Sequence, residues 1–368
     1  MTGEQLFQTL RLSPPDDPSR LAKTWENGTT DGIRTFVAFE DGALWLYRRC
    51  RDLGVDLASP RLKTLGEWLT SEARRATAGN LLVDDTAHQV VAILHDVGAP
   101  HVLLKGIARR RWRERMPYVA ARSTADVDIL VPCDNAWTAW HALRDHGYRH
   151  TGPPGARTVH HLPPLKAQAG VPVEIHTSTS RMVWPDDAWA RMDTTAVEAG
   201  DGFRIPAPTE LLWHAVAHGC DHRAASFRLR FWISVSAIVA SGAPLDWDCI
   251  LARLQSPEVT SPRRAAGWLQ AALMLAGAEP PSGLTAIGPP YPLRRHLAWR
   301  LRLARRGALE TRWGIRLREE ATRMEAGLPP IPIARDATLP LAARRRMASH
   351  LARWRYRLWR GTARGPEG

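Results

Sequence analysis

The stretch His101–Val131 reads HVLLKG, then an arginine-rich segment, then RSTADVDILV, and it decides the fold. The alternation over Asp126–Val131 is typical of a buried strand, in which side chains two residues apart point to the same face. Asp126 and Asp128 are therefore expected side by side. A divalent cation would relieve their repulsion. Hard oxygen ligands with no cysteine nearby favour magnesium or manganese over zinc.

Two further runs complete this pattern. His101–Lys105 is expected to be a second core strand that ends at Lys105-Gly106 and leads into a helix. A glycine at such a turn lets the backbone approach a phosphate, and the helix start favours the same anion. Val171–His176 is another short β-branched run and carries Glu174 between apolar residues. The sequence thus predicts a phosphate-binding turn followed by three carboxylates.

Together, these motifs resemble those of a known protein superfamily. The LLKG turn, the Arg-x-x-x-Asp-x-Asp strand and the later strand with its Glu-x-His pattern resemble the nucleotidyltransferase superfamily of the DNA polymerase β type. Within it, the chain is similar to a group of bacterial nucleotidyltransferase family proteins, over roughly Leu81 to Val239. The resemblance implies an α+β fold with a small mixed sheet as its core, N-terminal helices and a helical C-terminal region.

It also implies an activity. A nucleoside monophosphate would pass from a nucleoside triphosphate, such as ATP, to an acceptor with release of pyrophosphate, and Mg²⁺ or Mn²⁺ would assist. The acceptor is open: a small molecule, a peptide or RNA. The implied catalytic and metal-binding residues are Asp126, Asp128 and Glu174, and the implied phosphate-binding residues are Lys105, Gly106 and Arg122.

Two departures from the family pattern leave an alternative open. The usual Gly-Ser after the first strand is here Gly106-Ile107, so no hydroxyl is available there for a phosphate. A later arginine-rich run, Arg228–Ile233, is followed by Ser234 where related sequences often have aspartate. The alternative is a binding or accessory protein that keeps the nucleotidyltransferase fold without the chemistry.

Several histidines and arginines have more than one interpretation. The segment Arg109–Arg115 is either a solvated helix face or a source of triphosphate contacts. Of His160 and His161, strand alternation lets only one face the site, and His176 would support the metal ligands or bind substrate. A helix from Thr209 brings His214, His218 and His222 to one face, but Gly219 is expected to end it. Packing or substrate contact is favoured there over zinc.

The chain length of 368 residues suits two or three domains. We expect a mainly helical region at 1–80, the nucleotidyltransferase core at 81–205, a helical domain at 206–288 and a basic helical region at 289–368. Separate helices are predicted at Leu62–Ala78 and Asp84–Val97, with linker segments around 279–283 and 288–290.

Composition narrows the class of protein. Hydrophobic residues make up 44% and charged residues 24%, as in an ordinary soluble protein. The four cysteines are widely scattered, which argues against a zinc ribbon or a disulfide scaffold and favours the cytoplasm. We expect no signal peptide, because the N-terminus lacks a basic region followed by an apolar stretch. We also expect no transmembrane helix, because no apolar run reaches about 18 residues.

The excess charge of +13 lies at the C-terminal end. Residues 1–288 hold 31 basic and 31 acidic side chains, whereas residues 289–368 hold 19 arginines and 6 acids. The last predicted helix carries an apolar stripe of Met347, Leu351, Trp354 and Leu358 between arginines. Such a helix docks on the protein itself, on a membrane surface or on RNA phosphates, so a polyanionic partner would meet this region.

Overall fold

The computed structural model describes residues 2–12, 17–28, 30, 32–112, 123–151, 161–179, 185–221, 229–256, 259 and 262–305. All of them belong to one compact unit, Met1–Ile315. Arg122, His160, His222 and the basic C-terminal helix lie outside the described residues, so the predictions made for them stay predictions.

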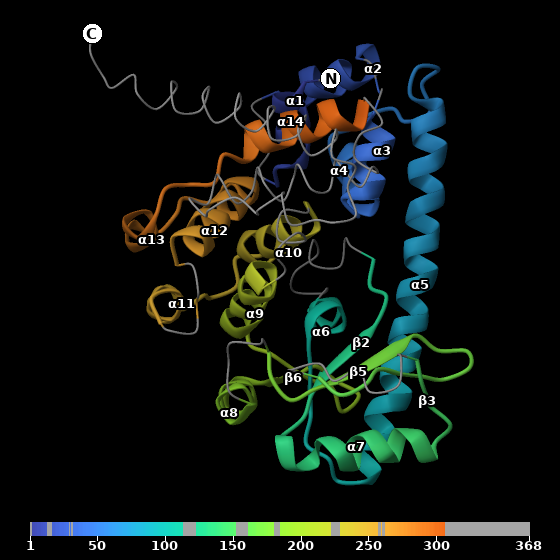
Figure 1. Ribbon diagram of the computed structural model, residues 1–368. Coiled ribbons are helices and arrows are strands. Elements are labelled where there is room, and N and C mark those ends of the chain that lie inside the picture. Colours follow the sequence, from blue (N-terminus) through green and yellow to red (C-terminus); the bar gives the residue numbers. More distant parts are fainter. Residues whose placement is uncertain are drawn as a thin grey trace, which may run out of the picture. The chain divides into compact units, whose positions relative to one another are not determined.

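The core is a five-stranded mixed sheet with the strand order β1-β2-β5-β4-β3 (Figure 1). Strands β2 and β5 are parallel to each other, and the remaining pairs are antiparallel. The predicted α+β class is confirmed. The strands are β1 (Val102–Leu103), β2 (Val127–Leu130), β3 (Arg149–His150), β4 (Leu165–Lys166) and β5 (Pro172–His176). A separate two-stranded sheet joins β6 (Val197–Glu198) and β7 (Arg204–Ile205).

The register of the central strands decides where the acidic residues lie. Asp128 pairs with Glu174, and Leu130 pairs with His176. Residues paired across neighbouring strands project to the same face of a sheet. Asp128 and Glu174 are thereby brought together, although 46 positions separate them in the sequence. Asp126 lies just before β2, outside the strand.

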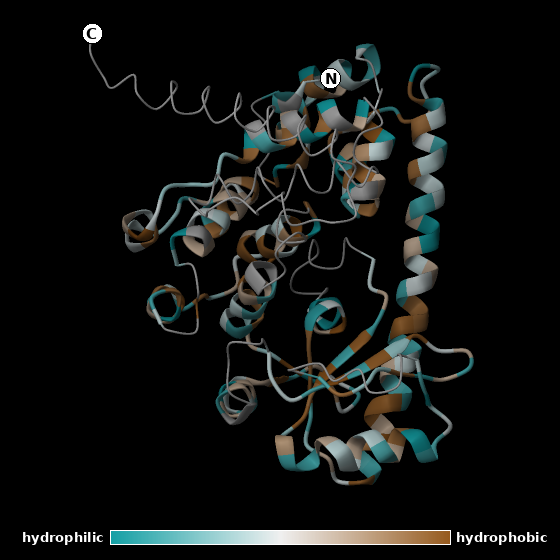
Figure 2. Ribbon diagram, in the orientation of Figure 1, coloured by the Kyte–Doolittle hydropathy of each residue, from teal (hydrophilic) through white to brown (hydrophobic). Residues whose placement is uncertain are grey.

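Helices α5 (Lys63–Asp96) and α7 (Cys133–Asp145) both contact the sheet, and α6 (Lys105–Arg111) follows β1 directly. Helix α5 also contacts α4 (Ala43–Asp52), so it joins the N-terminal helices to the sheet (Figure 1). Its apolar residues gather in the part near the sheet (Figure 2). This stripe at helical spacing consists of Val83, Ala87, Val90, Val91 and Leu94.

The prediction of two helices around residue 80 is wrong, because α5 runs unbroken through Gly79 and Asp84. Asp84 does not begin a helix, and its carboxylate instead forms an ion pair with Arg110. Asn80 is buried and accepts a hydrogen bond from the Thr124 backbone N–H at 2.9 Å. These tertiary contacts hold the middle of α5, where local sequence signals indicated a break.

Two glycines of α5 should respond oppositely to alanine. At Gly66 a methyl group would overlap the Leu57 carbonyl oxygen, whereas nothing lies within 4 Å of the corresponding position at Gly79. We expect Gly66→Ala to lower the free energy of unfolding by about 2 kcal/mol through overpacking. Gly79→Ala should raise it by about 0.5–1 kcal/mol through helix propensity. Urea unfolding of both variants measures these changes in the free energy of unfolding. Changes of the same sign and size in the two variants would contradict the close packing of Gly66 against Leu57.

The remaining described helices form a mainly helical assembly. Helix α10 packs on α9 and α12, and α14 packs on α1 and α3. The predicted regions 1–80 and 289–368 therefore contact each other through α14, and the four-region division stays a proposal. The helices are α1 (Gly3–Leu10), α2 (Pro18–Asn27), α3 (Ile33–Phe39), α8 (Pro185–Thr195), α9 (Pro208–Asp221), α10 (Leu229–Ala240), α11 (Trp247–Leu254), α12 (Pro262–Ala276), α13 (Ser282–Ile287) and α14 (Leu293–Arg305).

Two other local predictions are wrong. Helix α9 continues through Gly219 to Asp221, so glycine does not end it there. Ser282 and Gly283, expected as part of a linker, instead begin the helix α13 (Ser282–Ile287), in which Leu284 is fully buried. The Gln270 side-chain amide donates to the Gly288 carbonyl at 2.7 Å and fixes this segment against α12. Among the described helices, none is long and apolar enough to cross a membrane.

Candidate active site

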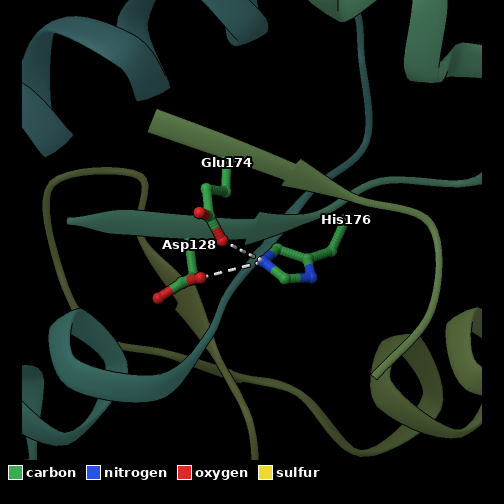
Figure 3. Close-up of side chains that lie close together, drawn as sticks. All are labelled: Asp128, Glu174 and His176. Carbon is green, nitrogen blue, oxygen red and sulfur yellow. Dashed lines mark hydrogen bonds and ion pairs between the residues drawn. The ribbon is translucent and has the colours of Figure 1, made fainter. Parts of the chain in front are cut away.

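Three side chains from β2 and β5 converge (Figure 3). The His176 Nε2 atom lies 2.8 Å from Asp128 Oδ1 and 3.4 Å from Glu174 Oε2. One ligand atom from each of the three residues lies within 4.8 Å of the others, a spacing that could hold a metal ion. Asp128 and His176 are each 1% exposed, whereas Glu174 is about a quarter exposed, so the cluster opens toward solvent on the Glu174 side.

Lys105 supplies a positive charge to the same cluster. Its Nζ atom donates to Asp128 Oδ1 at 2.5 Å and lies 3.8 Å from Glu174 Oε2. The backbone of Lys105 is left-handed, with φ of 48°, which is uncommon for a residue other than glycine. This conformation at the first residue of α6 accompanies the side-chain contact with the carboxylates.

Electrostatics keep these groups charged. Burial pushes the pKa of Asp128 upward, but the Lys105 ammonium and the hydrogen bond from His176 outweigh it and hold this pKa well below its usual value. The hydrogen bond from His176 also lowers the pKa of Glu174. Burial opposes the charge of Lys105, yet the charges of Asp128, Glu174 and Asp126 and the hydrogen bond to Asp128 together outweigh it and raise the Lys105 pKa. At neutral pH the cluster therefore holds two carboxylates and one ammonium.

The donor set fits a divalent cation. The second oxygen of Asp128, Oδ2, is buried without a hydrogen-bond partner among the described residues. A buried polar atom of this kind is costly unless an ion or a water satisfies it. Carboxylate oxygens on two adjacent strands are suitable ligands for Mg²⁺ or Mn²⁺.

The cluster forms one wall of a cavity of about 390 Å³. Helices α9 and α10 supply the other wall, and Asp41, in the turn between α3 and α4, also lines the cavity. The lining includes Asp41, Lys105, Gly106, Arg109, Ser123, Thr124, Asp126, Asp128, His161, Glu174, His214, His218, Arg230, Phe231 and Ser234. A cavity of this size suits a small-molecule ligand.

The structure brings most of the predicted site residues to this cavity. Asp126 lines it and contributes to the raised pKa of Lys105, but it is not one of the three residues whose ligand atoms cluster within 4.8 Å. The third residue of that cluster is His176, which was predicted to support the metal ligands or to bind substrate. Gly106 lines the cavity too, and a side chain there would overlap Thr124, so packing alone requires a glycine.

Several cavity residues were not predicted as site residues. Asp41 comes from the N-terminal helices, and Arg230 and Phe231 come from α10. Of the paired histidines, His161 lines the cavity, and burial lowers its pKa. His214 and His218 share one face of α9, and their spacing of four residues was the signal available in the sequence.

His214 should make the protein sensitive to acid. It is 2% exposed, and burial lowers its pKa to about 3 from an ordinary 6.5. Below pH 6.5 the unfolded chain binds a proton that the folded protein does not, so stability is lost as the pH falls toward 3. We expect about 2 kcal/mol of this loss between about pH 7 and about pH 5. The variant His214→Gln should lack this acid-dependent loss of stability.

Urea unfolding at the two pH values measures the effect. His95→Gln is the matched control, because His95 is 85% exposed at the end of α5. An acid-dependent loss of the same size in wild type and His214→Gln would contradict the burial of a neutral histidine.

Comparison with known families agrees with this geometry. Residues 43–275 match a family described as uncharacterised nucleotidyltransferases. The match covers more than half of the chain and extends beyond the predicted span of Leu81–Val239. The chain belongs to this nucleotidyltransferase family, which confirms the predicted resemblance. No curated protein matches the chain.

Proposed function

We propose that the protein is a Mg²⁺-dependent nucleotidyltransferase, which moves a nucleoside monophosphate from a nucleoside triphosphate to an acceptor and releases pyrophosphate. The observation that carries the proposal is the pairing of Asp128 with Glu174 on parallel strands at the wall of the cavity. Family membership supports the reaction class.

The carboxylates of Asp128 and Glu174 would hold the cation. Asp126, which lies just before β2, would be the third carboxylate ligand. A bound divalent cation neutralises charge on the phosphates as it develops. His176 donates from Nε2 to Asp128 and orients that carboxylate. These residues contribute positioning and charge, which are the main requirements of phosphoryl transfer.

Basic residues in the cavity would bind the triphosphate. Lys105, Arg109 and Arg230 all line it, and a guanidinium can bind phosphate oxygens through two parallel hydrogen bonds. We retain Arg122 in this role by its place in the motif. The glycine at position 106 keeps the backbone beside the cavity uncovered, in addition to its packing on Thr124.

The acceptor is proposed as a hydroxyl or phosphate group of a small molecule, a peptide or RNA. The arginines beyond residue 288 favour a polyanionic acceptor, although two of them are already paired within the described fold. Arg300 forms an ion pair with Glu40, and Arg294 lies 3.5 Å from Glu4. The free cysteines Cys50, Cys133 and Cys249 are compatible with the reducing cytoplasm that we propose as the location.

Two observations favour the alternative of a binding protein without activity. The ammonium of Lys105 already neutralises Asp128, and Ile107 is a fully buried apolar residue where the family pattern has serine. A chain that has lost the chemistry would keep this ion pair as a permanent substitute for the metal.

The proposal is tested by incubating the protein with triphosphates labelled at the α-phosphate, Mg²⁺ and cell extract. We expect label to appear on an acceptor in a Mg²⁺-dependent manner, with pyrophosphate released. Each of the four triphosphates is tried separately, and boiled protein provides the background. Absence of labelled product with every triphosphate, in an extract where a known nucleotidyltransferase labels its own acceptor, would favour the inactive alternative.

A further inference from the structure

The position of Lys105 bears on how the cation reaches its site. Its Nζ atom lies 2.5 Å from Asp128 Oδ1, 3.5 Å from His176 Nε2 and 3.8 Å from Glu174 Oε2. These are the same three residues whose atoms are spaced to hold a metal ion. The ammonium thus occupies the centre of the candidate metal site.

Two cations cannot share this site. A divalent ion on either oxygen of Asp128 would lie within a few ångströms of the ammonium bonded to Oδ1, and like charges at that range repel strongly in a buried environment. Asp128 is 1% exposed, so water provides little screening there. Either the metal or the Lys105 ammonium holds Asp128.

The Lys105 side chain has room to move away from Asp128. Its side chain is 18% exposed and lines the cavity, so rotation about its side-chain bonds would carry the ammonium away from Asp128 without unfolding. Its backbone at φ of 48° is a sparsely populated conformation for a lysine, and such conformations gather at functional sites whose surroundings hold them in place.

We infer that Lys105 holds the place of the divalent cation in the metal-free protein and that metal binding moves its ammonium from Asp128 into the cavity. There it meets the oxygens of the metal-bound triphosphate. The inference rests on the proposed function, because it concerns the metal of that same site. It gives Lys105 two successive anionic partners, first the carboxylates and then the phosphates.

Lysine acetylation tests this on the wild-type chain. The sequence has four lysines, and the other three, Lys23, Lys63 and Lys166, are exposed and serve as internal references. The full chain is treated briefly with acetic anhydride, with and without saturating Mn²⁺, and each lysine is quantified by mass spectrometry. We expect Lys105 to react slowly without metal and about an order of magnitude faster with it, while the references stay unchanged.

Metal affinity provides the second readout. Lys105→Met should bind Mn²⁺ about tenfold more tightly than wild type, because the competing cation is gone. Arg230→Met is the matched control: it removes one positive charge from the same cavity but leaves the Lys105–Asp128 contact intact. Its affinity should change by less than about threefold. Calorimetry or the manganese spin-resonance signal gives both constants.

The outcomes separate the two proposals. If wild type binds Mn²⁺ while Lys105 acetylation stays slow and Lys105→Met binds no more tightly, the inference is wrong and the proposed function stands. If Lys105→Met binds Mn²⁺ and wild type does not, the ammonium excludes the metal but is not displaced by it, so the inferred movement of Lys105 on metal binding is wrong. If neither protein binds Mn²⁺ or Mg²⁺, the metal-dependent function itself fails. The acetylation arm needs no variant, so misfolding of Lys105→Met leaves the inference testable.

Discussion

Replacement of Asp128 by asparagine is expected to slow nucleotidyl transfer by on the order of 10³-fold. Asparagine has the same shape, so the fold should be retained, but it removes the negative charge at the centre of the site. That charge contacts the Lys105 ammonium and the His176 imidazole and would hold the cation. Of the two carboxylates that cluster with His176, Asp128 is the more deeply buried, at 1% exposed against 23% for Glu174.

The matched control is Asp134→Asn. Asp134 is exposed in the first turn of α7, six residues farther along the same chain segment, and does not line the cavity. Its asparagine variant should keep the wild-type rate. Label transfer by Asp128→Asn at the wild-type rate, with an unchanged circular dichroism spectrum, would remove Asp128 from the catalytic site.

Replacement of Arg300 by methionine is expected to lower the free energy of unfolding by about 3–5 kcal/mol. Arg300 on α14 forms an ion pair with Glu40 at the end of α3, and both side chains are at most 2% exposed. The other oxygen of Glu40 accepts a hydrogen bond from the Leu229 backbone N–H at 2.8 Å, at the first residue of α10. Without Arg300, Glu40 would be a buried charge with no cationic partner in this contact.

Two comparisons isolate that cause. Arg302→Met changes an exposed arginine of the same helix and should alter stability by less than about 0.5 kcal/mol. Adding Glu40→Gln to Arg300→Met should recover part of the loss, because a neutral amide can still accept from Leu229 and carries no charge to bury. Urea unfolding measures all three variants. If the double variant loses more free energy of unfolding than Arg300→Met alone, the buried-charge explanation is contradicted.

Local periodicity was sufficient to predict the sheet core. The alternation around Asp128 and the β-branched run around Glu174 predicted two strands, and both are found. Strand alternation paired Asp126 with Asp128, and Glu174 was added as a third carboxylate. In the fold Asp126 lies just before β2, and the two carboxylates that cluster are those of Asp128 and Glu174. The parallel register of the two strands, which sets Asp128 against Glu174, is a property of the folded sheet.

The contacts that the sequence did not predict are long-range. For Lys105 the sequence left two partners open, a phosphate or a structural carboxylate, and it did not single out Asp128, which lies 23 positions away. The Glu40–Arg300 pair spans 260 positions. Asn80 holds α5 intact by accepting from Thr124, which overrides the weak break signals at Gly79 and Asp84. In each case a residue distant in the sequence determines the local structure or the contact, so the local sequence pattern does not reveal it.

Triphosphate binding with and without divalent metal tests the central claim most directly. A non-hydrolysable nucleoside triphosphate analogue is titrated into wild type and into Asp128→Asn by calorimetry, in Mg²⁺ and in chelator. We predict binding to wild type that requires Mg²⁺ and a large loss of affinity in Asp128→Asn. Binding of equal strength with and without Mg²⁺, or no binding to wild type under either condition, would contradict the proposal that this cavity takes a metal-bound nucleotide.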